Sequence, residues 1–325
     1  ANTLIANNPS RLGKELWTDG AKGDPITLYA AYNDLDEARF CVDRIRLWHD
    51  HGGRLTECAM LYRTSAQSRV LEDALRQAEL PYRVYGGFRF YERAEIKDAL
   101  AYVRLASSRG DDAAFERIVN VPPRGIGQRS IDELREVAKR ERITLWEATR
   151  RLTDTKELSA RSLGALQRFL DLIDRMSIAV NELPLAELLE HVIAQSGLVE
   201  HYKKEKGERG LDRIENLEEL VSAARDFKPA IDDEEIPILA AFLTHAALES
   251  GDGQAEAYSD CVQLMTLHSA KGLEFPQVFL VGVEEGLFPH MRSAADPVQL
   301  EEERRLCYVG ITRAMKKLTI TYAES

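Results

Sequence analysis

Strand-like and helix-like stretches alternate at both ends of this chain, and the alternation restricts its fold more than any other feature of the sequence. Short apolar stretches with strand character fall at residues 26–31, 59–62, 82–85, 262–266, 277–283 and 318–322. Amphipathic helical periods separate them at residues 35–51, 65–78 and 299–314. Strands that alternate with helices are typical of a parallel sheet covered by helices, so we predict the α/β class.

The middle of the chain has a different pattern. Strand signals are missing there, and helical periods follow one another at residues 96–107, 113–120, 131–142, 163–180, 185–196 and 213–227. Prolines interrupt these periods, and the acidic run 232–235 is typical of a solvated loop. We therefore predict one discontinuous α/β domain, residues 1–92 and 258–325, with an all-helical domain of residues 93–257 inserted into it.

The composition argues against several classes of protein. The chain has 43 Lys and Arg against 54 Asp and Glu, a net charge of −11, which is unlike a protein that coats DNA through diffuse positive charge. Local nucleic-acid contacts remain open, because salt screens charges that lie far apart. The four cysteines form no Cys-x-x-Cys pair, so we predict reduced thiols and no metal site. We find no membrane span and no secretory signal, and without an initiator Met we expect a piece of a longer protein.

The densest group of polar side chains lies in residues 264–275, a loop between two predicted strands. Thr266, His268, Lys271 and Glu274 bring a hydroxyl, an imidazole, an ammonium and a carboxylate together within nine residues. Ligands of open α/β sheets collect at the carboxyl ends of strands, where this loop should lie. From the residues alone, a capped strand-to-helix turn explains the segment equally well, and a partly buried structural histidine is the commoner case for His268.

Three further segments carry candidate side chains. In residues 301–314, a helix with glutamates near its N-terminus precedes Arg313, although a lone arginine there is usually a solvated cap. In residues 120–128, two glycines permit positive φ and outward N–H groups that can hold a phosphate, yet an ordinary helix–helix turn fits the spacing equally well. The aromatic and basic run 85–93 has the composition of a base-stacking platform, but we favour core and hinge.

Together with several shorter stretches, these motifs resemble the C-terminal half of UvrD/Rep/PcrA-type superfamily 1 DNA helicases. The shorter stretches are residues 11–14, 16–19, 61–69, 85–98, 123–127 and 213–220. The segments 264–275 and 301–314 are similar to motifs V and VI of that family, and the resemblance covers essentially the whole chain. It implies a RecA-like domain carrying a helical insert, within a 3′-to-5′ helicase of DNA repair.

The resemblance implies a nucleotide site shared with a preceding half of the protein. Arg313 corresponds to the arginine finger that reaches the γ-phosphate, Glu274 to a carboxylate on the ribose, and Lys271 to a group near the phosphates. The cofactors would be ATP and Mg²⁺. The sequence contains no G-x-x-x-x-G-K-[ST] phosphate loop, which in the family lies in the N-terminal RecA-like domain. We therefore predict that the isolated chain neither hydrolyses ATP nor unwinds DNA.

The resemblance also implies contacts with single-stranded DNA. Thr266 and His268 correspond to residues that link the ATP cleft to the strand. Arg63 and Ser65 correspond to contacts with the DNA backbone, where the family often has Asn in place of Ser65. In the insert, the family likeness favours a grip on duplex phosphates without base readout. Its residues are Gly125 and Gly127, with Arg124 and Arg129 as supporting cations.

The expected partners follow from the same resemblance. They are single-stranded DNA, junctions of single- and double-stranded DNA, the N-terminal RecA-like domain of the same protein, and proteins of mismatch and excision repair. No membrane partner is expected, and the implied location is the bacterial cytoplasm, associated with the nucleoid. The alternative is a non-catalytic DNA-binding or protein-interaction module of helicase ancestry, although a purely structural domain has no need of both Arg313 and Glu274.

Overall fold

The computed structural model describes residues 1–9, 17, 23–156, 158–205, 207–229, 236–251, 259–294 and 296–324. The chain divides into two compact units, residues 1–90 with 253–325, and residues 91–252. The acidic run 232–235 and the stretch 11–14 lie outside the described residues, as does the stretch 16–19 apart from Trp17. Among the described residues, no helix has both the length and the apolar character needed to span a membrane.

A parallel sheet of six strands forms the centre of the first unit. The strands are β1 (Thr27–Ala31), β2 (Cys58–Tyr62), β3 (Tyr82–Val84), β4 (Val262–Thr266), β5 (Phe275–Leu280) and β6 (Ala314–Ala323). Their order is β1-β6-β5-β2-β4-β3, and every pair of neighbours is parallel. The predicted α/β class is therefore confirmed, with β2 lying between two strands from the far end of the chain.

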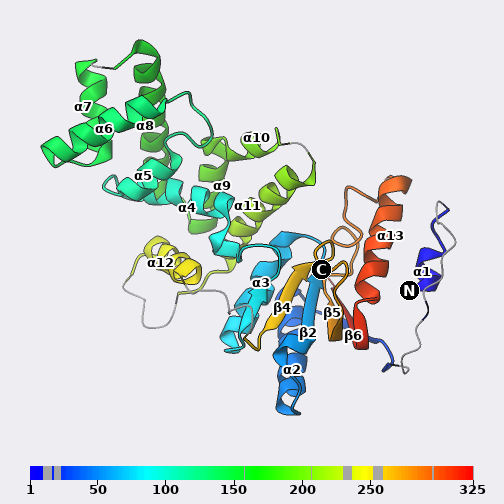
Figure 1. The fold of residues 1–325 in the computed structure, drawn as a ribbon. Coiled ribbons are helices and arrows are strands. Elements are labelled where there is room, and N and C mark those ends of the chain that lie inside the picture. The colour runs from blue at the N-terminus through cyan, green and yellow to red at the C-terminus, as the bar shows by residue number, and fades with distance from the viewer. Residues whose placement is uncertain are drawn as a thin grey trace. The chain divides into compact units, whose positions relative to one another are not determined.

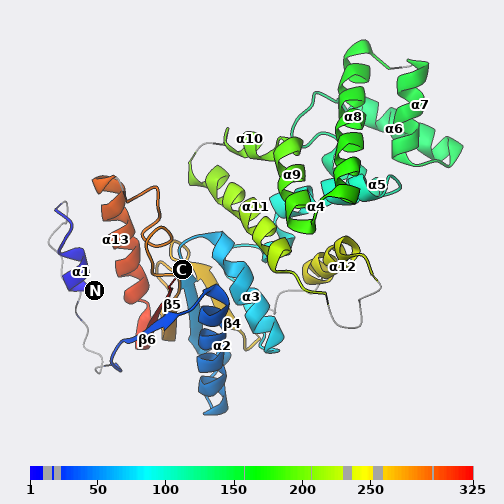
Figure 2. The ribbon, with the colours of Figure 1, turned by 180° about the vertical axis from the view of Figure 1, so that it is seen from behind.

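Helices cover both faces of this sheet. They are α1 (Asn2–Ile5), α2 (Asp34–Asp50), α3 (Ser68–Gln77) and α13 (Pro297–Ile311), with short 3-10 turns at Leu55–Glu57, Ser65–Gln67 and Phe90–Glu92. Successive side chains of a strand point to opposite faces, so Met60 packs in the core beneath α2 and α3, while Leu61 packs in the core beneath α13. Figures 1 and 2 show α2 and α3 on one side of the strands and α13 on the other.

The described part of the second unit consists of helices joined by turns. These are α4 (Ala94–Ser107), α5 (Asp112–Ile118), α6 (Gln128–Glu141), α7 (Leu145–Thr155), α8 (Ala160–Glu182), α9 (Leu185–Ser196), α10 (Leu198–Tyr202), α11 (Glu208–Asp226) and α12 (Ile238–Gly251). Sequence periodicity missed α7, α10 and α12. A local signal for α7 was present, because the Thr144 side chain accepts from the Glu147 N–H while the Glu147 carboxylate accepts from the Thr144 N–H.

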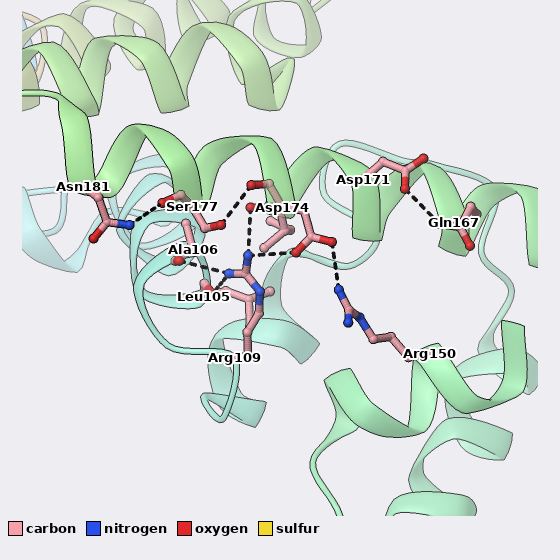
Figure 3. Close-up of polar contacts among 10 residues, drawn as sticks. Leu105, Ala106, Arg109, Arg150, Gln167, Asp171, Asp174, Ser177 and Asn181 are labelled. Carbon is pink, nitrogen blue, oxygen red and sulfur yellow. Dashed lines mark hydrogen bonds and ion pairs between the residues drawn. The ribbon is translucent and has the colours of Figure 1, made fainter. Parts of the chain in front are cut away.

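One arginine ties three helices of the second unit together (Figure 3). The Arg109 guanidinium donates to two carbonyls at the end of α4, at 2.7 and 2.9 Å, and to Asp174 Oδ1 of α8 at 3.0 Å. Arg150 of α7 donates to the other oxygen of the same carboxylate at 3.0 Å. The Arg109 guanidinium also lies 4.5 Å from the ring centroid of Trp146 in α7. These charge-assisted bonds fix α7 and α8 against the C-terminus of α4.

Candidate functional site

The loop from β4 to β5 begins at the carboxyl end of one strand and finishes at the amino end of another. Its first turn is capped by Thr266, whose hydroxyl oxygen accepts from the Ser269 N–H at 3.3 Å and lies 3.1 Å from the Ser269 hydroxyl. His268, Lys271 and Glu274 are exposed along the rest of the loop. The capped turn is thus formed by the threonine, while three chemically active side chains are left facing solvent.

Arg313 lies between α13 and β6 and is bonded to the end of that loop. Its guanidinium donates to the Leu273 carbonyl at 2.7 Å, to the Val309 carbonyl at 3.1 Å and to the Thr312 hydroxyl at 3.0 Å. The Arg313 carbonyl in turn accepts from the Phe275 N–H at 2.9 Å, which joins the starts of β5 and β6. The residue after Leu273 is Glu274, so the structure brings this cation and this carboxylate to the amino ends of the same two strands.

Gly310 explains how α13 presents Arg313 at this position. A Cβ atom on Gly310 would lie 2.7 Å from Leu267 Cδ2 and 3.1 Å from Leu280 Cδ1, distances shorter than packed side chains adopt. The absence of a side chain therefore lets the last turn of α13 sit directly on the β4–β5 loop and on β5. Arg313 follows Gly310 by about one helical turn, so the close packing at Gly310 also fixes the position of Arg313.

Arg63 follows β2 and is held by a carboxylate that sequence reasoning missed. Its guanidinium forms a two-point ion pair with Glu303 of α13, with N···O distances of 2.8 to 3.1 Å. The side chains are only 11% and 4% exposed. Glu303 also accepts from the His290 N–H at 3.2 Å and the Ser293 hydroxyl at 3.3 Å, so one carboxylate joins β2, α13 and the loop between β5 and α13.

A sequence signal for Glu303 existed. Leu306, Cys307 and Gly310 occupy the helical positions three, four and seven residues later, which places Glu303 on the apolar face of α13. We read the three glutamates 301–303 only as favourable charges near a helix N-terminus. The spacing of the apolar residues along α13 therefore distinguishes Glu303 from Glu301 and Glu302, which precede it in sequence.

The turn after β2 is fixed by Gln67, and a carboxylate of α2 binds the backbone shortly after β5. Gln67 Oε1 accepts from the N–H groups of Arg63 and Thr64 at 3.0 and 2.9 Å, and half-buried Ser65 lies within this turn. Buried Glu37 of α2 accepts from the Gly282 N–H at 2.9 Å. Burial raises the pKa of Glu37 above its usual 4.5, partly offset by hydrogen bonds from Thr321 and Gly282.

This raised pKa predicts a pH-dependent stability. A carboxyl group whose pKa is higher in the folded state than in the unfolded state contributes most to folding stability when pH lies below its unfolded-state pKa. That contribution is lost as pH rises through the folded-state pKa. Glu37→Gln keeps an acceptor for the Gly282 N–H, so we expect the variant to be more stable than the parent at about pH 8 and equal to it at about pH 4. Urea unfolding at both pH values measures this, with Asp43→Asn as the exposed control on the same helix. An equal gain at both pH values would contradict the assignment.

The sheet order arranges the candidates of this unit in two groups. Tyr62 pairs with Thr266, so Arg63 and Ser65 follow one strand while Thr266 and His268 end its neighbour, at the carboxyl edge of the sheet. Lys271 and Glu274 come later in the loop, which meets Arg313 at the amino ends of β5 and β6. A single loop of nine residues, 266–274, therefore runs from one group to the other.

In the second unit, the glycine-bearing turn begins α6 and only one of its glycines requires a special conformation. Gly125 has φ of +78°, whereas Gly127 has φ of −76° and is the N-cap of α6. A Cβ on Gly127 would meet no atom within 4 Å. The N–H end of α6 follows, with no acidic residue in its first turn.

The two arginines of this turn differ in their surroundings. The Arg124 guanidinium is directed inward, donating to the carbonyls of Ile118 at 2.9 Å and Pro122 at 3.2 Å and to the Tyr102 hydroxyl. The side chain of Arg129 is 93% exposed and pairs with Glu133 at 3.0 Å. Arg124 therefore shapes the turn, while Arg129 is the cation that faces solvent.

Comparison with known proteins places the chain in a family. A family model described as the UvrD-like helicase C-terminal domain matches residues 1–325. The chain is 60% identical over 325 residues to DNA helicase II of Escherichia coli (strain K12), and 58% identical to DNA helicase II of Haemophilus influenzae. Each match covers 100% of this chain and 45% of the relative.

A more distant relative gives the same result. The chain is 41% identical over 331 residues to ATP-dependent DNA helicase PcrA of Bacillus subtilis (strain 168), a match covering 100% of the chain and 44% of that protein. The chain thus spans less than half the length of the curated relatives it matches. Its α/β unit is RecA-like, and because the family match extends over the whole chain, the chain belongs to the UvrD-like helicase C-terminal domain family.

Proposed function

We propose that the chain is the C-terminal module of an ATP-dependent, 3′-to-5′ DNA helicase that acts in DNA repair. The observation that carries the proposal is the loop 266–274, which runs from residues suited to DNA at the carboxyl edge of the sheet to residues suited to a nucleotide beside Arg313. In this proposal the two compact units correspond to the discontinuous RecA-like domain and its helical insert.

The nucleotide-facing residues supply part of an ATP site. Arg313 and Lys271 offer cations to phosphate oxygens, and Glu274 offers a carboxylate to ribose hydroxyls. Lys271 and Glu274 are exposed and Arg313 is partly exposed, which fits a polyanionic ligand approaching from outside. The sequence has no phosphate loop, and the described residues contain no cluster of three or more His, Cys, Asp or Glu that could hold a metal ion. The phosphate cradle and the Mg²⁺ ligands would therefore come from an N-terminal RecA-like domain.

The chemistry assigned to these residues is electrostatic. A cation aimed at the transferring phosphoryl group stabilises the charge that develops on it, and Arg313 would supply that cation. In the structure that guanidinium is bonded to carbonyls of its own unit, so it is held in place before ligand binding. Lys271 would neutralise phosphate charge from the same loop.

The residues at the carboxyl edge are assigned to single-stranded DNA. His268 is exposed at the end of β4, and its neighbour Thr266 holds the turn that presents it. Arg63 is fixed by Glu303, which holds its guanidinium in one position after β2, where we assign it to a DNA phosphate. Movement of the loop on ATP binding would then be felt at both groups, which is the coupling that a translocating enzyme needs.

The insert is assigned to duplex contact. The first turn of α6 contains no acidic residue and presents backbone N–H groups, and exposed Arg129, which pairs with Glu133, lies in that turn. Gly125 provides the sharp turn and Gly127 the open approach. Arg124 supports this contact indirectly, since its bonds to the surrounding carbonyls fix the turn. The further partners in this proposal are mismatch- and excision-repair proteins, and the location is the bacterial cytoplasm at the nucleoid.

The function is tested by comparing the full-length protein with the chain of residues 1–325. We expect the full-length protein to hydrolyse ATP faster with single-stranded DNA present and to unwind a duplex with a 3′ tail but not one with a 5′ tail. We expect the 325-residue chain to show no ATP turnover. Turnover by the chain alone, or unwinding of the 5′-tailed substrate, would contradict the corresponding part of the proposal.

The duplex contact is tested at Gly127, where a side chain has room. Gly127→Leu places its side chain in open space outside the fold, so we expect thermal stability to change little and affinity for duplex DNA to fall about tenfold through a blocked phosphate contact. Fluorescence anisotropy of tailed duplex and single-stranded DNA, across a salt series, measures this. Gly110→Leu, also without neighbours within 4 Å, is the matched control. Equal duplex affinities of the two variants would remove Gly127 from the interface.

A further inference from the structure

The aromatic run that follows β3 divides into a buried part and an exposed part. Phe90 is 1% exposed, and its N–H donates to Glu72 of α3 at 3.2 Å, which anchors the run in the first unit. Tyr85 and Phe88 are 41% and 67% exposed. The interpretation of this run as core and hinge therefore does not account for Tyr85 and Phe88, whose rings reach the surface.

The exposed part lies against the loop assigned to single-stranded DNA. The Tyr85 N–H donates to the Leu264 carbonyl at 2.8 Å, which continues the pairing of β3 with β4 by one residue. At the next residue, a Cβ on Gly86 would lie 3.4 Å from the Ser269 hydroxyl. Ser269 is the residue after exposed His268. Tyr85 directly precedes Gly86 and Phe88 follows two residues later, so both belong to the segment that approaches the loop at Ser269.

The strand order places these rings in line with the proposed phosphate contact. Along the carboxyl edge, β2 is followed by β4 and then by β3, and adjacent strands lie about 4.8 Å apart. Arg63, His268 and Tyr85 thus lie on three neighbouring strands in a staggered row, with Tyr85 level with Leu61 and so two residues short of Arg63 along the strands. A row with a cation at one end and aromatic rings at the other offers separate contacts to the backbone and to the bases of one strand.

We propose that Tyr85 and Phe88 form a stacking platform for unpaired bases, extending the single-stranded DNA track beyond His268. This inference rests on the proposed function, because it assumes that the strand crosses this edge. Every base has a π-face, so stacking on these rings would add affinity without selecting a sequence. Gly86, with φ of +74°, turns the backbone between the two rings.

The test uses the full-length protein and a fluorescent oligothymidylate, with affinity measured across a salt series. Phe88→Ala is expected to weaken binding roughly tenfold to hundredfold without changing the slope of log K against log salt, since a ring releases no counterion. Phe88→Trp is expected to retain the affinity and Phe88→Leu to lose it, because leucine keeps the apolar volume without the π-face. Tyr85→Ala is expected to act in the same direction. An oligonucleotide carrying 2-aminopurine should lose its stacking-dependent quenching in Phe88→Ala.

Two control variants separate the possible failures. Tyr32→Ala removes a ring that is 89% exposed at the other edge of the sheet and is expected to leave binding unchanged. Arg63→Ala tests the track itself and should lower the magnitude of the salt slope by about one. It is compared at a temperature where its unfolding curve shows it folded, because the substitution also leaves nearly buried Glu303 without this cation. If Arg63→Ala has this effect while Phe88→Ala binds like Tyr32→Ala, the platform is overturned and the track stands. If Arg63→Ala also binds like the parent, the track and the platform are both overturned.

Discussion

Replacing Arg313 by alanine in the full-length protein is expected to lower DNA-stimulated ATP turnover by about 10³- to 10⁵-fold, the range that an arginine finger contributes in phosphoryl transfer. The loss arises because the developing charge on the transferring group would no longer face a fixed cation. Arg313→Lys should recover little, since an ammonium cannot reproduce the guanidinium fork that binds the Leu273 and Val309 carbonyls. Steady-state ATPase assays with saturating single-stranded DNA measure the effect.

The same variants should keep their affinity for single-stranded DNA. Arg313 lies at the amino ends of β5 and β6, whereas the residues assigned to DNA follow the carboxyl ends of β2 and β4. The matched control is Arg305→Ala in α13, because this arginine pairs with Glu301 at 3.3 Å and Glu302 at 2.9 Å. Turnover in Arg313→Ala equal to that of Arg305→Ala would reject the nucleotide role of Arg313.

Removing Glu303 is expected to destabilise the first unit by about 3–5 kcal/mol, because Glu303→Ala leaves the nearly buried Arg63 cation without its carboxylate. The two bonds from Glu303 to the loop between β5 and α13 would be lost as well. Urea unfolding followed by Trp48 fluorescence measures the effect, with Trp17 and Trp146 replaced by phenylalanine in every variant.

Two comparisons test the physical reason for this loss. Glu302→Ala, next in sequence but on the solvent side of α13 with a side chain 58% exposed, should change stability by no more than about 0.5 kcal/mol. Arg63→Leu combined with Glu303→Leu should recover much of the stability, since an apolar pair leaves no buried charge. If the double variant is as unstable as Glu303→Ala, the cost comes from the loop contacts and not from an uncompensated cation.

The sequence predicted the layers of the fold better than the edges of its elements. Apolar strands alternating with helical periods were enough for the α/β class, because burial on both faces leaves a strong pattern. The last helix was expected to reach residue 314, but α13 ends at Ile311 and β6 already begins at Ala314. Helical periodicity cannot locate that boundary, since Thr312 and Arg313 fit a last helical turn and a connection equally well.

The chemical types of the side chains were enough to identify the candidate residues in the sequence, but not to identify the residues that bind them in the fold. His268, Lys271 and Glu274 stood out because reactive groups are dense in one loop, and all three are exposed. The bond from Arg313 to the Leu273 carbonyl joins residues 40 apart, and the Arg63–Glu303 pair joins residues 240 apart. Contacts over such separations depend on strand order, which no local pattern of the sequence encodes.

The strand order has a consequence for how this chain is made. None of the three strands from the first segment neighbours another: β1 pairs with β6, β3 with β4, and β2 with β4 and β5. During synthesis, residues 1–90 therefore emerge before any strand that pairs with β1, β2 or β3. These strands cannot form their hydrogen bonds until the helical unit and the strands after it have been translated. At roughly 5–20 residues per second, that wait lasts on the order of ten seconds or more. The helical unit needs no such partner, so it can fold while the strands ahead of it remain targets for chaperones or for other nascent chains.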